Sequence, residues 1–250
     1  ANLRIVTDAL VTRIEFQGRE ATAVLYERGG QQHRAVAGRE IVLSAGSFGT
    51  PQILQLSGVG PAALLRDHGI PVVHELKGVG ENLMDHLLVK RSYRTTSRQT
   101  LNVLMRNPAS LALAALRYGL FRSGPLAGGP APLGGYTRTD ARFETPDIQF
   151  FYIPFDVDIF GADLAPYSGF QISFYKSRPE ARGQLRIRSA DPREAPHIAI
   201  NYLGPDSDTR TVIDGLRFVG RVGKGEALAR FGATEVLPGL AEESDDALLD

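Results

Sequence analysis

Short runs of β-forming residues separated by turn residues fill the first 45 positions. The predicted strands lie at 3–7, 10–16 and 21–27. Between them, Gln17-Gly18 and Gly29-Gly30 supply turn residues. A fourth run, at 41–43, is apolar and β-branched and stops at Ser44-Ala45-Gly46-Ser47. That pattern is typical of a buried strand that ends in a tight turn, so we expect a meander followed by a buried strand.

Helical signals follow this turn. Thr50 and Pro51 are suited to the N-cap and first turn of a short helix at 52–56, which Ser57-Gly58 ends. Further elements are a helix at 62–68 opened by Pro61, a strand at 70–73 and a turn at 78–81. Residues 1–86 therefore have a mixed α/β pattern.

The pattern changes after residue 86. Asn107-Pro108 opens a predicted helix at 109–121, and a glycine- and proline-rich loop occupies 123–135. Strands at 147–153, 170–176 and 184–189 and a helix at 206–222 follow. Leu185 and Ile187 alternate with Arg186 and Arg188, which indicates a sheet with one solvated face. The predicted fold class is α/β (α+β), and the second part is an antiparallel sheet flanked by helices.

The overall composition excludes several classes of protein. The 43% hydrophobic and 22% charged residues are typical of a globular domain. Because 28 Lys and Arg balance 28 Asp and Glu, no net field favours nucleic acid. The chain has no cysteine, and its five histidines lack ligand spacing, so we predict no disulfide and no metal site. Without an apolar run of membrane-spanning length or a signal-like start, we expect a cytoplasmic protein.

One glycine motif suggests nucleotide binding. Gly58-Val59-Gly60-Pro61-Ala62-Ala63 has the GxGxxA form of a dinucleotide fingerprint. However, a helix is predicted directly before it, where the fingerprint needs a strand, and the following helix is short. A nucleotide-binding module that uses this turn remains one alternative, and a non-catalytic remnant is another.

Residues 41–60 as a whole match a much more specific pattern. Ser47, Thr50-Pro51 and Ser57-Gly58-Val59-Gly60 stand at the spacing of the second signature of the glucose-methanol-choline oxidoreductases. The segments 78–86 (GVGENLMDH), 182–192 (RGQLRIRSADP) and 196–203 (PHIAINYL) resemble further blocks of that family, in the same order. The sequence therefore resembles this family over nearly its whole length, most of all its choline dehydrogenase branch.

The resemblance implies an FAD-dependent enzyme that oxidises a primary alcohol to an aldehyde. Its partners would be a small-molecule alcohol and an electron acceptor, either quinone-like or oxygen, and the oligomeric state is left open. Residues 1–86 would form the later part of the FAD-binding domain. Residues 87–250 would form the substrate-binding domain and the start of the carboxy-terminal region.

Two family hallmarks have no counterpart in these 250 residues. The resemblance places the FAD-binding GxGxxG before Ala1 and the catalytic histidine after Asp250. We therefore expect the chain to be a fragment that is inactive alone, with no catalytic residue of its own. Asp85 and His86 are not expected to form a dyad, because adjacent residues of a strand point to opposite faces.

The resemblance assigns cofactor-binding residues to the first part of the chain. A strand that breaks into small residues lets a cofactor approach the backbone closely, which favours Ser44, Ala45 and Gly46. By resemblance these three residues lie along the FAD, and Thr50, Pro51 and Asn82 of the matching motifs are assigned to the cofactor as well. We also expect Asn82 to satisfy backbone groups in the turn where it lies. Val11 matches the valine whose backbone meets the adenine edge. Ordinary sheet packing is the alternative for the turn at 44–46 and for Val11.

Substrate-pocket candidates lie in and after the loop at 124–136. In choline-specific relatives, a glutamate just before the Gly-Gly pair balances the ammonium of the substrate. Here Pro132 and Leu133 precede Gly134-Gly135, which makes a neutral alcohol a reasonable substrate. The proposed pocket residues are Pro132, Leu133, Tyr136 and Tyr152, and core packing is the alternative for the aromatic ones.

The apolar helix at 109–121 allows a further interpretation. Arg117 and Arg122 lie near its end, and a helix of this kind can lie in a membrane interface. Packing against the sheet is the alternative to this peripheral membrane contact.

Overall fold

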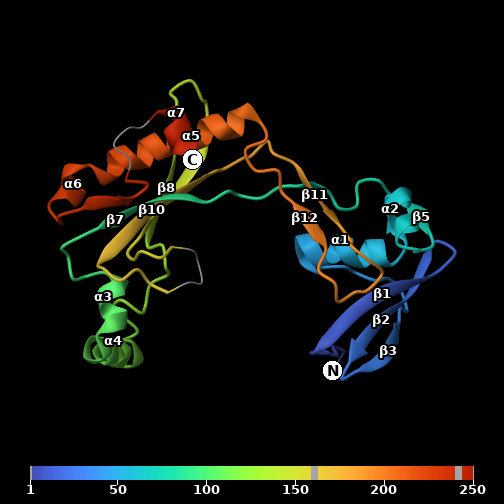
Figure 1. Ribbon diagram of the computed structural model, residues 1–250. Coiled ribbons are helices and arrows are strands. Elements are labelled where there is room, and N and C mark those ends of the chain that lie inside the picture. The colour runs from blue at the N-terminus through green and yellow to red at the C-terminus, as the bar shows by residue number, and fades with distance from the viewer. Residues whose placement is uncertain (1, 159–162, 240–243, 250) are drawn as a thin grey trace. The chain divides into compact units, whose positions relative to one another are not determined.

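The computed structural model describes residues 2–158, 163–239 and 244–249 and divides the chain into two compact units (Figure 1). The first unit comprises Ala1–Asp85 and Ala181–Tyr202, and the second comprises His86–Glu180 and Leu203–Asp250. The sequence predicted one boundary near residue 86. The structure divides the chain there as well, but the segment 181–202 returns to the first unit.

A three-stranded antiparallel meander opens the first unit. Its strands, in the spatial order β1-β2-β3, are β1 (Ala9–Gln17), β2 (Glu20–Arg28) and β3 (Gln31–Val36). Gly18, Gly29 and Gly30 have positive φ in the two connecting turns. Ile14 and Ala23 are buried, and the helix α1 (Gly46–Leu56) packs against β1. The predicted strands at 10–16 and 21–27 are thus confirmed.

Two strands predicted from the sequence do not form. Residues 2–7 and 40–44 have no regular structure, so the strands predicted at 3–7 and 41–43 are wrong for this chain. Leu3 and Ile5 are each 75% exposed, and Val42 is 74% exposed. The physical reason is that a strand needs a hydrogen-bonded neighbour, and no described strand pairs with either segment.

Small paired elements complete the first unit. They are β4 (Val59–Gly60), α2 (Ala62–Asp67), β5 (His74–Glu75), β6 (Glu81–Leu83), β11 (Gly183–Arg186) and β12 (His197–Ala199). β4 and β5 are parallel, and a second sheet has the order β12-β11-β6. The strand predicted at 70–73 instead lies at 74–75. Leu185 and Ile187 are buried whereas Arg188 is exposed, which confirms the predicted alternation.

A five-stranded antiparallel sheet is the centre of the second unit. Its spatial order is β13-β7-β10-β9-β8, with β7 (Val89–Arg94), β8 (Leu133–Thr137), β9 (Ile148–Ile153), β10 (Gly169–Lys176) and β13 (Thr234–Leu237). The strands predicted at 147–153 and 170–176 are confirmed. β8 also begins inside the stretch that the sequence predicted to be a loop.

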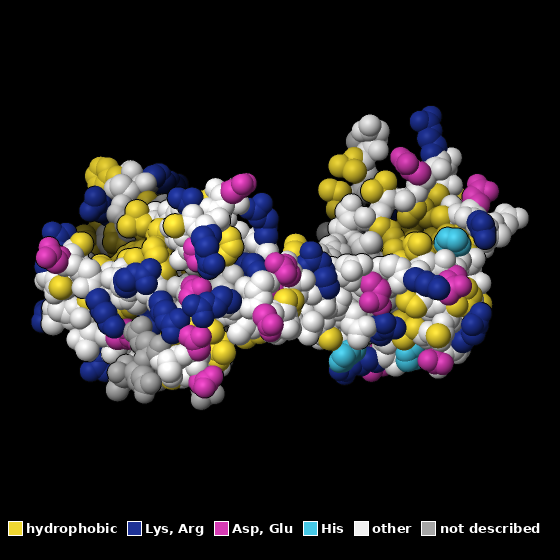
Figure 2. All heavy atoms as spheres, turned by 90° about the horizontal axis from the view of Figure 1, so that it is seen from above, with side chains coloured by type: hydrophobic (Ala, Val, Ile, Leu, Met, Phe, Trp, Pro, Cys, Tyr) yellow, Lys and Arg dark blue, Asp and Glu magenta, His cyan; other side chains and the backbone are white. Residues whose placement is uncertain are grey.

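One long helix, α5 (Asp206–Gly223), covers one face of this sheet (Figure 1). The core beneath it contains Ile172, Phe174 and Val219, all at most 2% exposed. The other helices of the unit are α3 (Leu101–Arg106), α4 (Pro108–Phe121), α6 (Glu226–Ala229) and α7 (Asp245–Leu249). On the surface drawn in Figure 2, basic and acidic side chains are interspersed, as the zero net charge suggests.

Candidate functional site

The small-residue turn before α1 is open to solvent. Ser44, Ala45 and Gly46 are exposed, and Gly46 has φ +77°. No described atom lies within 4 Å of the position that a Cβ on Gly46 would take. The backbone N–H of Ala45 donates a hydrogen bond to Thr50 Oγ1 at 3.1 Å, which holds the turn against the first helical turn. The structure therefore presents backbone without bulky side chains, as the sequence predicted.

The helix that follows this turn is longer than the sequence predicted. It begins at Gly46, with Ala45 at the N-cap position, so Thr50 is not its N-cap and Pro51 lies inside it. Pro51 is tolerated because its missing N–H removes only the bond to the carbonyl of Ser47, in the first turns of the helix. No acidic residue stands in the first turn, so the helix presents unpaired backbone N–H groups and no opposing carboxylate at the open turn.

A buried glutamine fixes the other end of α1. Gln55 is fully buried, and its Nε2 donates to the carbonyls of Val79 at 3.2 Å and Leu185 at 3.1 Å. Its Oε1 accepts a hydrogen bond from the backbone N–H of Ile187 at 2.9 Å. The Gln55 side chain thus joins three segments, 41–60, 78–86 and 182–192, that each resemble a separate block of the family sequence. Sequence reasoning missed it, although a polar residue within the run Ile53 to Leu56 was a signal.

Val11 and Asn82 also lie in the first unit. Val11 is partly buried on β1, pairs with Tyr26 and adjoins a β-bulge. Asn82 lies exposed on β6 with φ +59°, a conformation that asparagine tolerates better than most residues. Within the described residues its side chain makes no hydrogen bond, so it does not satisfy backbone groups as expected. Their roles toward a cofactor stay predictions.

The glycines of the GxGxxA motif pack against the chain itself. A Cβ on Gly58 would lie 2.4 Å from the Pro71 carbonyl oxygen, and one on Gly60 would lie 3.3 Å from Gln55 Cγ. The helix after them, α2, has six residues. These glycines permit close packing of the chain and leave no open space at the turn for a pyrophosphate, which argues against the nucleotide-binding alternative.

Asp85 and His86 have separate surroundings. Asp85 accepts a hydrogen bond from the Tyr202 hydroxyl, in the first unit. Burial, together with this hydrogen bond, raises the pKa of Tyr202 to about 12. The His86 ring stacks on Tyr175 at 4.0 Å in the second unit, with Nε2 3.1 Å from the Ser177 carbonyl oxygen. The two side chains form no dyad, as the sequence reasoning expected.

The face of the large sheet opposite α5, which we call the open face, carries aromatic and polar side chains. Tyr136, Gln149 and Tyr175 lie in register across β8, β9 and β10. The Tyr175 hydroxyl donates to Gln149 Oε1 at 2.5 Å, and the Phe151 ring lies 5.6 Å from that of Tyr175. Burial raises the pKa of Tyr175. Sequence reasoning missed Gln149 and Tyr175, although their alternation with core residues of the strands was a usable signal.

A buried carboxylate secures one end of the open face. Asp156, 3% exposed, accepts hydrogen bonds from Ser92 Oγ at 2.7 Å, Gln171 Nε2 at 3.1 Å and the Tyr167 hydroxyl at 2.5 Å. Near it, Gln171 Oε1 and Ser173 Oγ are buried without a hydrogen-bond partner among the described atoms. Such orphan polar atoms are rare in folded proteins and need a functional or solvent explanation.

The predicted substrate-pocket residues do not share one face. Leu133 pairs with Tyr152 and shares its face, on which the Tyr152 ring packs 5.3 Å from Phe170 beside the core under α5. Tyr136 projects from the open face and is 63% exposed. Pro132 lines a separate pocket of about 570 Å³, formed with α3 and the loop at 124–129. Only Tyr136 of these four lies with the aromatic cluster of the open face.

Two kinds of feature are missing from the described residues. No group of three or more His, Asp or Glu side chains is arranged to hold a metal ion among them. None of their helices is both long enough and apolar enough to cross a membrane.

Comparison with known proteins places these features in a family. The amino-terminal and carboxy-terminal models of the GMC oxidoreductases match residues 1–88 and 179–250. The chain therefore belongs to the GMC oxidoreductase family.

Choline dehydrogenases are among the curated relatives. The oxygen-dependent choline dehydrogenase of Pseudomonas fluorescens is 36% identical over 99% of this chain and 44% of its own length. The corresponding protein of Stenotrophomonas maltophilia is 37% identical over 98% of this chain and 43% of its length. The chain thus spans less than half of the curated relatives it matches.

Solved structures have the same fold. A formate oxidase variant from Aspergillus oryzae, studied for FAD modification, is 25% identical and superimposes with a TM-score of 0.87 over 96% of this chain and 47% of its own. A fungal aryl-alcohol oxidase, 21% identical, superimposes with a TM-score of 0.77 over 96% of this chain and 48% of its own. The predicted α/β class with an antiparallel sheet is confirmed.

Proposed function

We propose that the protein carrying this chain oxidises a primary alcohol to an aldehyde with FAD, and that this chain supplies part of the FAD cradle and a substrate wall. The observation that carries the proposal is the exposed turn Ser44–Gly46 at the start of α1. The choline dehydrogenases and FAD-containing oxidase among the relatives support the same reaction.

The residues at this turn fit an anionic cofactor. The space beyond Gly46 is open, and the first turn of α1 carries no carboxylate. Backbone N–H groups at a helix N-terminus stabilise phosphate oxygens. Bound FAD would supply the chemistry by accepting hydride from the alcohol carbon. Ser44, Ala45 and Gly46 hold the cofactor through backbone groups, Thr50 and Pro51 shape the turn, and Val11 and Asn82 contact the cofactor elsewhere.

The open face of the second unit is the proposed substrate wall. Tyr136, Phe151 and Tyr175 offer ring surface, and Gln149 orients the Tyr175 hydroxyl. The carboxylate of this face, Asp156, is buried and accepts three side-chain hydrogen bonds, so it does not balance a cationic substrate. Pro132, which precedes the Gly-Gly pair where choline-specific relatives have a glutamate, carries no charge either. The wall therefore suits a neutral alcohol with an apolar body better than choline.

The test is flavin reduction by alcohols in the protein that carries this chain. Under anaerobic conditions, benzyl alcohol should bleach the flavin absorbance, with a second-order rate constant for flavin reduction at least tenfold above that of choline. Reoxidation by oxygen and by a soluble quinone, measured separately, then identifies the acceptor. Flavin that no primary alcohol reduces would contradict the proposed reaction, whereas preference for choline would contradict the proposed substrate class alone.

We also propose that the protein acts in the cytoplasm with a peripheral membrane contact through α4. Leu113, Leu116, Leu120 and Phe121 on this helix are each at least 57% exposed. The segment 95–139 around it contains five arginines and no Asp or Glu, in a chain with no net charge. Exposed apolar side chains beside arginines fit the surface of an anionic bilayer.

Sedimentation with lipid vesicles tests this contact. The protein should bind vesicles that contain phosphatidylglycerol more strongly than vesicles of phosphatidylcholine alone. Leu120→Glu combined with Phe121→Glu should abolish binding, whereas Phe143→Glu, an exposed aromatic position outside α4, should not. Equal binding by both variants would contradict the contact.

A further inference from the structure

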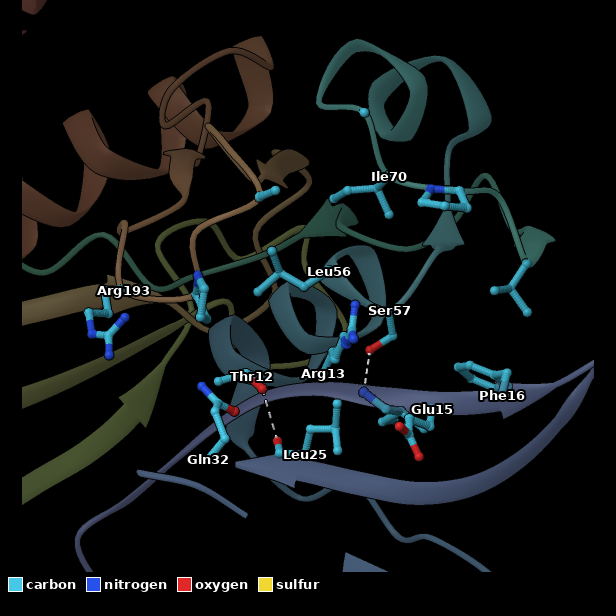
Figure 3. A pocket seen from close by; sticks show the side chains of 16 residues that line it. Thr12, Arg13, Glu15, Phe16, Leu25, Gln32, Leu56, Ser57, Ile70 and Arg193 are labelled. Atoms are coloured by element: carbon cyan, nitrogen blue, oxygen red, sulfur yellow. Dashed lines mark hydrogen bonds between the residues drawn. The ribbon is translucent and has the colours of Figure 1, made fainter. Parts of the chain in front are cut away.

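A pocket of about 610 Å³ lies in the first unit, between β1, the end of α1 and the loop at 69–73 (Figure 3). Its volume is in the range of small-molecule sites. None of the residues proposed to hold FAD lines it. A ligand in this pocket would therefore bind apart from the proposed FAD site.

Hydrogen bonds hold the walls of this pocket in place. On one side, the backbone N–H of Ile14 on β1 donates to Ser57 Oγ at 2.8 Å. On the other side, the N–H of Ile70 donates to the Leu65 carbonyl at 2.9 Å, and that of Val73 to the Gly58 carbonyl at 2.8 Å. The pocket is thus formed before a ligand arrives, which lowers the entropic cost of binding.

The lining combines apolar and polar side chains. Leu56 and Ile70 are at most 9% exposed and belong to one buried cluster. The apolar lining residues are Ile14, Phe16, Leu25, Leu56, Ile70, Pro71, Val73, Ala190 and Pro192. Such a surface favours a ligand with an apolar body.

One positive charge in the lining has no counter-charge. Glu15 is paired with Arg34 at 2.6 Å, and Arg193 is paired with Glu27. Arg13 lines the same pocket and is exposed, and no described residue forms a hydrogen bond or ion pair with it. Figure 3 shows Arg13 beside Ser57. A guanidinium in this setting favours a carboxylate, which it can bind through two parallel hydrogen bonds.

We propose that this pocket binds a carboxylate with an apolar body, its head group on Arg13 and its body on the apolar lining. An aromatic acid and a medium-chain fatty acid share this chemistry. The shape of the lining decides between them, so both are used as probes.

Calorimetric titration of the protein that carries this chain tests the site. The probes are 1-naphthoate, decanoate and the uncharged 1-naphthamide. We expect saturable binding of at least one carboxylate and at least tenfold weaker binding of the amide. Arg13→Gln should weaken the carboxylate about tenfold, the effect of losing a charge-assisted hydrogen bond, and leave the amide unchanged.

Two further variants separate the site from general charge and folding effects. Arg19→Gln removes an exposed arginine in the turn after β1, outside the lining, and should bind like the unmodified protein. Gln32→Glu places a nearly isosteric negative charge in the lining and should weaken the carboxylate. Absence of saturable binding, equal binding of carboxylate and amide, or equal losses in Arg13→Gln and Arg19→Gln would each overturn the proposal.

Discussion

Gly215 of α5 lies directly against the ring of Phe174 on β10. A Cβ at Gly215 would come within 2.1 Å of the ring, and Phe174 is fully buried. The same helix approaches Tyr93 at Gly223, where a Cβ would lie 2.1 Å from the hydroxyl oxygen. The long helix therefore covers the sheet closely because two glycines face two aromatic rings, and this contact helps to fix the sheet whose open face is the proposed substrate wall.

The first prediction follows from this contact. Gly215→Ala should destabilise the protein by roughly 1–3 kcal/mol through overpacking, although alanine is the better helix former. Gly119→Ala in α4, where no described atom beyond the backbone of that helix turn lies within 4 Å of the new methyl group, should stabilise it by up to about 1 kcal/mol. Urea unfolding of both variants measures the difference. Stabilisation by Gly215→Ala would refute the packing described here.

The buried amide of Gln55 carries the second prediction. Gln55→Leu leaves the Ile187 N–H and the Val79 and Leu185 carbonyls without partners in the core, which should cost roughly 2–4 kcal/mol. Hydrogen exchange at the Ile187 amide should accelerate in parallel. As the control, Gln52→Leu removes an exposed bond to the Glu194 carbonyl and should change stability by less than about 1 kcal/mol. Equal effects of the two variants would contradict the role of Gln55.

Alkaline pH provides the third prediction. Burial, followed by the hydrogen bond to Asp156, raises the pKa of Tyr167 to about 12 from its ordinary value of 10. Between these values the unfolded chain releases a proton that the folded protein keeps, so the free energy of unfolding should fall as pH rises from 10 to 12. Tyr167→Phe should make this fall shallower, whereas Tyr118→Phe on the exposed α4 should not. Unfolding by urea across this pH range measures both, and identical slopes would contradict the assignment.

The fourth prediction concerns the substrate wall. Tyr136→Ala should lower kcat/KM for benzyl alcohol about fivefold, mainly through KM, because loss of ring contact costs roughly 1 kcal/mol. Tyr152→Phe, on the face toward α5, should leave both constants nearly unchanged. Steady-state kinetics of the two variants test this choice of face. A larger loss in Tyr152→Phe than in Tyr136→Ala would show that the substrate lies elsewhere.

Sequence alone predicted some of the elements whose partners lie within the chain but missed β3, β7 and β13, which also have such partners. The strands at 10–16 and 147–153 form because each has a neighbour to bond, and Asn107 caps α4 by accepting the Ser110 N–H at 3.1 Å. The run at 41–43 has the same propensity but no described partner, and it stays without regular structure. Local pattern records propensity, whereas strand formation depends on pairing partners elsewhere.

Sequence reasoning predicted only part of the candidate site, because the roles of some of its residues depend on partners elsewhere in the chain. The small residues of 44–46 were visible in the sequence because an open backbone needs such residues. Gln55 and Tyr175 were missed because their importance comes from segments far away along the chain. Tyr136 and Tyr152 were grouped by residue type, and only strand register shows that they face opposite sides of the sheet.

The FAD cradle at the turn before α1 is the central claim, and flavin retention tests it most directly. Gly46 and Gly29 both have positive φ, and both have open space where a Cβ would lie. Gly46→Val and Gly29→Val thus impose similar backbone strain, but only the first places a side chain at the proposed cofactor surface. We predict that the purified Gly46→Val protein retains at least tenfold less flavin than the Gly29→Val protein. Equal flavin content in the two would contradict the claim.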